Sequence, residues 1–181
     1  CQSCLPVRIP TARFKPRRSQ RRIWRKGYGI EVQEQPARFS AEHFELYSRY
    51  INTRHPEGEM ALLSEQQYME FLRCNWCDTR FFEFRLDQRL LAVAVTDLLT
   101  RGLSAVYTFF DPLFASFSPG VFSILWQIQE SQRRGLPWLY LGYWIPGCRK
   151  MEYKGDYRPL QVYRENRWQE IGPGETPGPV Q

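Results

Sequence analysis

Residues 80–110 read RFFEFRLDQRLLAVAVTDLLTRGLSAVYTFF, and this stretch decides the fold class. Two apolar runs, rich in the aromatic and β-branched residues that favour strands, flank the short turn Asp87-Gln88. A third run of the same kind follows Gly102. The stretch therefore predicts a hairpin that continues into a third antiparallel strand.

In the segments on either side of this meander, the apolar residues recur with other spacings. Helices are predicted at 39–55, 64–72 and 119–135, a buried strand at 138–145 and a final hairpin at 160–171. The second helix opens with Ser64 and Gln67 in capping-box positions. Residues 6–33 alternate loosely, which predicts strand and loop. This order describes an α+β domain and resembles the order of elements in GNAT-like acyltransferases.

Charge is distributed unevenly along the chain. The first thirty residues carry 9 of the 25 basic residues and none of the 19 acidic ones. Trp24 and Tyr28 are interleaved with these arginines, which favours a folded surface that binds nucleic acid. A solvated basic strand or a flexible arm is the alternative. The candidate contacts are Arg17, Arg18, Arg21, Arg22, Arg25 and Lys26.

Four of the five cysteines form two C-x-x-C pairs, Cys1 with Cys4 and Cys74 with Cys77. Together the pairs offer four zinc or iron–sulfur ligands, but the separation between them is far longer than in a zinc ribbon. We therefore expect ordinary thiols at Cys74 and Cys77, and leave open a metal at Cys1 and Cys4 whose other ligands lie elsewhere. Nucleophilic chemistry at Cys148 is disfavoured, because no histidine is placed to orient it.

Two further segments bear on catalysis. In GNAT-like acetyltransferases, backbone N–H groups of a glycine-rich turn before the long helix hold the pyrophosphate of the donor. Here the turn contains Pro119, which lacks an N–H, and only Gly120 gives close backbone access, so a CoA donor is disfavoured. After the strand at 138–145, residues 146–159 combine cations with tyrosines and predict the lip of a site. A solvated loop is the alternative.

Several long strings resemble the bacterial branch of the arginyl-tRNA–protein transferase family. They include CLPVRIP (4–10), RFKPRRSQRR (13–22), YSRYINTRHPEGEM (47–60), YLGYWI (140–145) and CRKMEYKGDYRPLQ (148–161), and the likeness runs from Cys1 to about Ile171. The resemblance implies an enzyme that transfers leucine from Leu-tRNA to proteins with N-terminal Asp or Glu and so marks them for degradation. The resemblance implies that the enzyme requires no cofactor, although cysteines related to Cys1 and Cys4 are linked with an iron–sulfur cluster in the eukaryotic branch.

The resemblance also implies a domain division. We expect residues 1–35 to end a smaller N-terminal domain whose first part is missing, residues 36–171 to form the GNAT-like catalytic domain, and 172–181 to be a disordered tail. No apolar run is long enough for a membrane span, so no membrane partner and a cytoplasmic location are expected.

Transfer from an aminoacyl ester to an amine requires alignment, an oxyanion contact and a cation for the acceptor carboxylate. The candidates for proton transfer or amine binding are Tyr107, Asp111 and Tyr143. The candidates for the acceptor carboxylate are Arg149, Lys150 and Arg158. The alternatives from other classes are a CoA-dependent N-acetyltransferase and a non-catalytic nucleic-acid-binding module.

Overall fold

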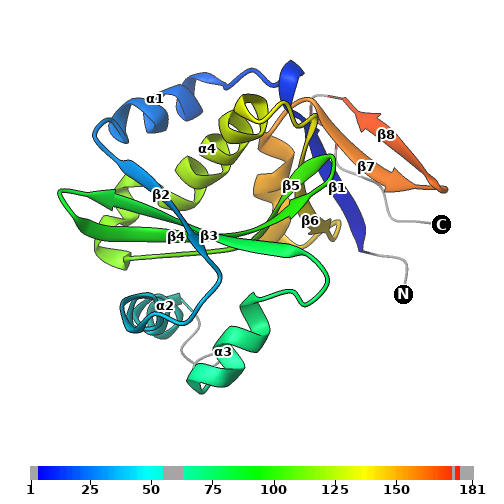
Figure 1. Ribbon diagram of the computed structural model, residues 1–181. Helices are drawn as coiled ribbons and strands as arrows, with labels where there is room; N and C mark the ends of the chain where they lie inside the picture. Colours follow the sequence, from blue (N-terminus) through cyan, green and yellow to red (C-terminus); the bar gives the residue numbers. More distant parts are fainter. Residues whose placement is uncertain (1–3, 55–62, 173, 176–181) are drawn as a thin grey trace.

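An eight-stranded mixed sheet is the centre of the protein, which a computed structural model describes for residues 4–54, 63–172, 174 and 175 (Figure 1). The strand order is β2-β3-β4-β5-β6-β1-β7-β8. The strands are β1 (Leu5–Pro10), β2 (Glu31–Pro36), β3 (Asp78–Leu86), β4 (Arg89–Leu99), β5 (Gly102–Phe110), β6 (Trp138–Trp144), β7 (Leu160–Arg164) and β8 (Arg167–Ile171). The predicted α+β class is confirmed.

The meander lies where the sequence predicts it. β3 pairs antiparallel with β4, and β4 with β5. Asp87 and Gln88 both have positive φ, as the mirror-image turns of two-residue hairpins require. The final hairpin, β7–β8, turns in the same way at Glu165 and Asn166.

Helices cover both faces of the sheet (Figure 1). On one face lie α1 (Arg18–Lys26) and α4 (Pro119–Arg133), and on the other α2 (Ala41–Arg54) and α3 (Glu65–Leu72). Phe122, Leu125 and Ile128 of α4 are buried against the first face, whereas α2 and α3 contribute the buried rings of Tyr47 and Tyr68 to the second. The predicted capping box of Ser64 and Gln67 starts α3.

The prediction of strand and loop for residues 6–33 is wrong in its middle, where α1 forms. Gln20, Ile23, Trp24 and Gly27 recur at helical spacing and form the inward face of this helix. Trp24 stacks on Phe122 of α4 with the ring centroids 5.1 Å apart. A side chain at Gly27 would overlap the Phe122 ring, because a Cβ there would lie 2.1 Å from it.

Both ends of the basic segment join the main sheet. β1 lies between β6 and β7, and β2 pairs with β3. The domain boundary expected at residue 35 therefore falls inside β2, and β1 and β2 share one sheet with the strands that follow.

β5 and β6 separate along their length. They pair in parallel only from Gly102–Ser104 to Trp138–Tyr140, and no further pairing between them is present in the described residues. Gly142 of β6 has φ of +71°, a backbone conformation that residues other than glycine rarely adopt. The carboxyl ends of the two strands are thereby free to lead into separate structures, and these structures hold the candidate site.

Candidate functional site

The six predicted nucleic-acid contacts are gathered on α1 and its N-cap. Arg18, Arg21, Arg22 and Arg25 are exposed on the outward face of the helix, and we call these four the basic ridge. Arg17, the N-cap residue, forms an ion pair with Asp156, so its charge is partly neutralised. Lys26 donates to the carbonyl oxygen of Ser116 at 3.2 Å. The ridge itself carries a charge of +4 on one helix with no acidic residue in its sequence.

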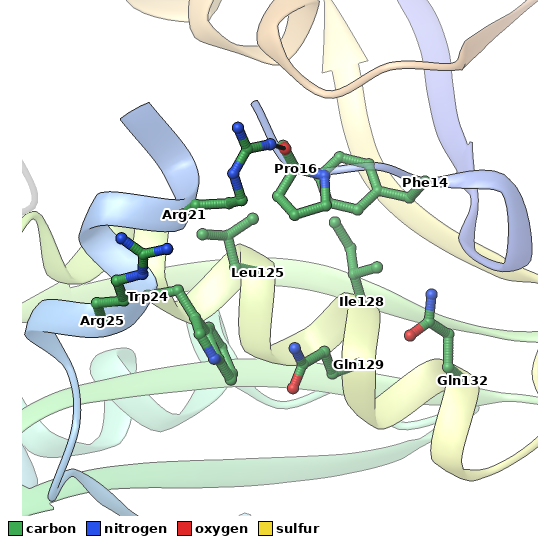
Figure 2. A pocket seen from close by; sticks show the side chains of 9 residues that line it. All are labelled: Phe14, Pro16, Arg21, Trp24, Arg25, Leu125, Ile128, Gln129 and Gln132. Carbon is green, nitrogen blue, oxygen red and sulfur yellow. Dashed lines mark hydrogen bonds between the residues drawn. The ribbon is translucent and has the colours of Figure 1, made fainter. Parts of the chain in front are cut away.

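An apolar pocket lies beside the basic ridge, between α1 and α4 (Figure 2). Its volume is about 250 Å³. Leu125 and Ile128 of α4 and Trp24 of α1 supply apolar surface, and Arg21 and Arg25 stand at the α1 side of the pocket. Its remaining lining residues are Phe14, Pro16, Gln129 and Gln132.

A second hollow of about 470 Å³ lies at the start of α4. Ser118 has φ of +53° and does not cap the helix with its side chain, and Pro119 contributes no N–H. The N–H groups of Gly120 and Val121 lie in the first turn, where a helix offers no internal carbonyl partner. Arg54, at the end of α2, lines the same hollow. Cation and helix terminus together make this hollow suited to an anion.

The structure places this hollow next to the end of the basic ridge. Ser116, which accepts from Lys26 of α1, belongs to the 3-10 helix η3 (Pro112–Phe117) that leads into α4. At its other end α1 contacts the segment after β6, through the ion pair of Arg17 with Asp156 and a 3.2 Å bond from the Gln20 amide to the Asp156 carbonyl. α1 thus connects the segments that follow the carboxyl ends of β5 and β6.

The polar segment after β6 is not an open loop, because residues Arg149–Asp156 form a 3-10 helix, η4. Arg149 and Lys150 are exposed at its start and make no hydrogen bond or ion pair with any described residue. Arg158 differs, since its guanidinium donates to the carbonyl oxygens of Gly155, Ile171 and Glu175, each at 2.8 Å. Three of its five N–H donors are thus occupied by backbone, so Arg149 and Lys150 are more available to a ligand, and the assignment of Arg158 to the acceptor carboxylate stays a prediction.

Lys154 is one of the cations of the predicted lip at 146–159, and nothing in the sequence assigns it a specific role. It is 7% exposed, and its ammonium group donates to the carbonyl oxygen of Tyr143 on β6. Burial lowers its pKa to about 8, against a smaller opposing effect of Cys148. Tyr143 itself is 56% exposed. A buried amine with a lowered pKa therefore contacts the backbone of an exposed predicted site residue.

Replacing Lys154 with Met is expected to change how stability depends on pH. The folded pKa of about 8 lies below the unfolded value of 10.5, so between these values the unfolded chain binds more protons. The free energy of unfolding of the wild type should therefore gain a contribution that rises with pH through this window, and the variant should lack it. Urea unfolding at pH 8.0, 8.5, 9.0 and 9.5 measures the difference. Parallel curves for the two proteins would contradict the assignment.

Comparison with known proteins decides the family. The family model described as "Arginine-tRNA-protein transferase, C terminus" matches residues 42–164, which include the hollow and η4. The chain belongs to this family. Proteins named aspartate/glutamate leucyltransferase are 51% identical in Alcanivorax borkumensis and 48% in Chromobacterium violaceum. The alignments cover 94% and 96% of this chain and 70% and 72% of those relatives.

Solved structures share the fold at low sequence identity. One is the C-terminal domain of a protein from Agrobacterium fabrum described as a putative lysylphosphatidylglycerol synthetase, with a TM-score of 0.56 and 12% identity. Another is L-PGS from Bacillus licheniformis, with a TM-score of 0.59 and 10% identity. Each likeness covers 77% of this chain but less than half of the other, 46% and 45%. At this level of identity, the two likenesses concern the fold alone.

Two of the predicted catalytic residues, Asp111 and Tyr107, are hydrogen-bonded or packed against other residues of the fold. Asp111 is 2% exposed, accepts from Arg89 at 3.0 Å and caps η3 by accepting from the Leu113 N–H at 3.0 Å. Tyr107 lies among aromatic rings on the α2–α3 face, with the Phe71 ring centroid at 5.4 Å, and burial raises its pKa. Neither residue lies on the α1–α4 face with the basic ridge and the apolar pocket. Their assignment as proton handlers stays a prediction.

The cysteines divide into two groups. Cys4 is exposed just before β1, and Cys1 lies outside the described residues. Cys74 and Cys77 lie close to Asp97 of β4, with the three potential ligand atoms all within 4.8 Å of one another.

Among the described residues, no helix is both long and apolar enough to cross a membrane.

Proposed function

We propose that the chain is an aminoacyltransferase that moves leucine from Leu-tRNA to the α-amino group of proteins beginning with Asp or Glu. The observation that carries the proposal is the basic ridge on α1, which leads to an anion-suited hollow at the start of α4 in a chain of this family. The names of the relatives supply the amino acid and the acceptor residues.

The donor would lie along the α1–α4 face. The basic ridge offers four guanidinium groups to the phosphates of the tRNA acceptor arm. The apolar pocket behind Arg21 and Arg25 suits an unstacked base, because a base needs an apolar or aromatic surface to stack on. The hollow with Arg54 and the free N–H groups of α4 suits a phosphate or the ester end of the donor.

The reaction is aminolysis of an ester. The α-amine of the acceptor attacks the aminoacyl carbonyl carbon, an amide bond forms, the bond to the ribose oxygen breaks, and the amine proton ends on the released hydroxyl. Because an α-amine has a pKa of about 8, much of it is already neutral and the protein mainly aligns the reactants. The free cations Arg149 and Lys150 would then bind the side-chain carboxylate of the acceptor.

The broader role extends from this activity. A destabilising N-terminal leucine would mark the acceptor for degradation. The catalytic domain would be GNAT-like, and no cofactor would take part in the transfer. The protein would be located in the cytoplasm. A CoA donor is disfavoured, because Pro119 removes a backbone donor from the turn that would hold its pyrophosphate.

A peptide series tests the acceptor half of the proposal. The full-length protein, supplied with Leu-tRNA, should extend peptides that begin with Asp or Glu by one leucine residue. Matched peptides that begin with Asn or Gln should react at least tenfold more slowly, because the uncharged amide loses the cation contact. An N-acetylated Asp peptide is the control and should not react. Equal rates for Asp and Asn peptides would refute carboxylate selection.

A further inference from the structure

We propose that Cys74, Cys77 and Asp97 form a zinc site that holds the connection between α3 and β3. The proposal concerns the opposite end of the strands from the hollow at α4. Asp97 of β4 pairs with Ser104, near the start of β5, whereas the hollow follows the end of β5 at Phe110. The site would therefore stabilise the fold and take no part in acyl transfer.

The two thiols come from the short segment between α3 and β3, and the carboxylate comes from a neighbouring strand. One ligand atom from each of the three residues lies within 4.8 Å of the others. In a tetrahedral zinc site with Zn–S bonds of about 2.3 Å, two sulfur ligands lie about 3.8 Å apart. The observed grouping needs only small side-chain movements to reach that geometry.

A surrounding hydrogen-bond network orients the carboxylate. Thr79 is 5% exposed, and its hydroxyl group donates to Oδ1 of Asp97 at 2.6 Å. The same oxygen of Thr79 accepts from the backbone N–H of Cys74 at 3.1 Å. Asp97 and Thr79 are also partners in the β3–β4 ladder. Such contacts fix metal-binding carboxylates in known sites, and here they join the thiol segment to the carboxylate.

The donor set selects the metal. Two thiolates with one carboxylate suit Zn²⁺, which accepts sulfur and oxygen ligands, better than Mg²⁺ or Ca²⁺, which take oxygen. All three residues are at least partly buried, which limits competition from water. The fourth position is open to a water molecule. A disulfide between the two cysteines is the competing chemistry, and it would leave the carboxylate without a partner cation.

Metal analysis of the full-length protein tests the proposal. Protein expressed with added zinc should retain one zinc per chain at this site, and the Asp97→Asn and Cys74→Ser variants should each lose it. Asp97→Asn is the decisive variant, because asparagine keeps the size of the side chain and its oxygen can still accept from Thr79. Cys148→Ser is the control, since it removes another free thiol and should leave the zinc content unchanged.

Cobalt substitution supplies a second readout, and its first part uses the wild-type protein alone. Cobalt added to the metal-free wild type should give thiolate-to-cobalt charge-transfer absorption, and this signal should fall by at least half in Asp97→Asn at equal cobalt. The proposal is overturned if the wild type binds neither metal at micromolar concentration. It is also overturned if zinc depends on Cys4 alone, or if peptide mapping finds a Cys74–Cys77 disulfide in protein kept under reducing conditions.

Discussion

Replacing Arg18, Arg21, Arg22 and Arg25 together with Gln is expected to weaken tRNA binding by on the order of 10²–10³-fold near physiological salt. All four side chains are exposed on one helix face, and no acidic residue lies in α1 to offset them. For every phosphate that the variant no longer neutralises, the slope of log affinity against log salt should also fall by about 0.9. A tRNA titration at four salt concentrations measures the affinity and the slope together.

The matched control changes the same charge elsewhere. Arg38, Arg73, Arg101 and Arg167 are exposed on other segments, and replacing them with Gln removes four charges without altering the basic ridge. This control should lower affinity slightly, through net charge, and leave most of the salt slope. Arg17 is kept in both variants, because its ion pair with Asp156 ties α1 to η4. Equal losses in the two variants would mean that tRNA responds to net charge and not to the ridge.

The second large effect is expected at the acceptor side. Replacing either Arg149 or Lys150 with Ala should reduce transfer to Asp- and Glu-starting peptides at least tenfold, about 1.4 kcal/mol. A carboxylate that loses water on binding needs a cation partner, because burying it unpaired costs several kcal/mol. These two side chains are exposed and make no ion pair with described residues, so they are available for that contact.

Peptide kinetics at saturating Leu-tRNA, with a tRNA-binding curve for each variant, measure this effect. The reduction should fall on the acceptor KM or on kcat/KM while tRNA affinity is nearly unchanged. Arg158→Ala is the informative comparison, because its guanidinium already holds three backbone carbonyls and its removal should act through stability. If Arg149→Ala and Lys150→Ala instead weaken tRNA binding and keep the acceptor KM, the two cations belong to the tRNA interface.

Local patterns in the sequence predicted most of the fold. The meander of β3 to β5, the capping box of α3, α4 and the β7–β8 hairpin all depend on neighbouring residues, and each formed as expected. α1 was missed because its inward face is only Gln20, Ile23, Trp24 and Gly27 among many arginines. Its stability depends on Phe122, which lies far along the chain in α4. The insertion of β1 between β6 and β7 is equally non-local.

The site was less predictable, because its residues take their roles from distant partners. Arg158 was predicted to bind a carboxylate from its charge, and the sequence does not report that its guanidinium donates to the carbonyl oxygens of Gly155, Ile171 and Glu175. Lys154 was predicted only as one cation of the lip, and its burial and its contact with the Tyr143 carbonyl oxygen depend on the fold. Asp97 joins the C-x-x-C pair through strand register, which no spacing along the sequence reports.

The most direct test of the proposed activity is a choice of donors offered to the full-length protein. A peptide that begins with Asp is incubated with Leu-tRNA and, separately, with acetyl-CoA, and the product is analysed by mass spectrometry with fragment sequencing. With Leu-tRNA the peptide should gain one leucine residue, attached to its α-amino group. The four-Gln variant of the basic ridge should form this product far more slowly at limiting tRNA, and acetyl-CoA should give no product. An acetylated peptide from acetyl-CoA, with no leucine added from Leu-tRNA, would contradict the account.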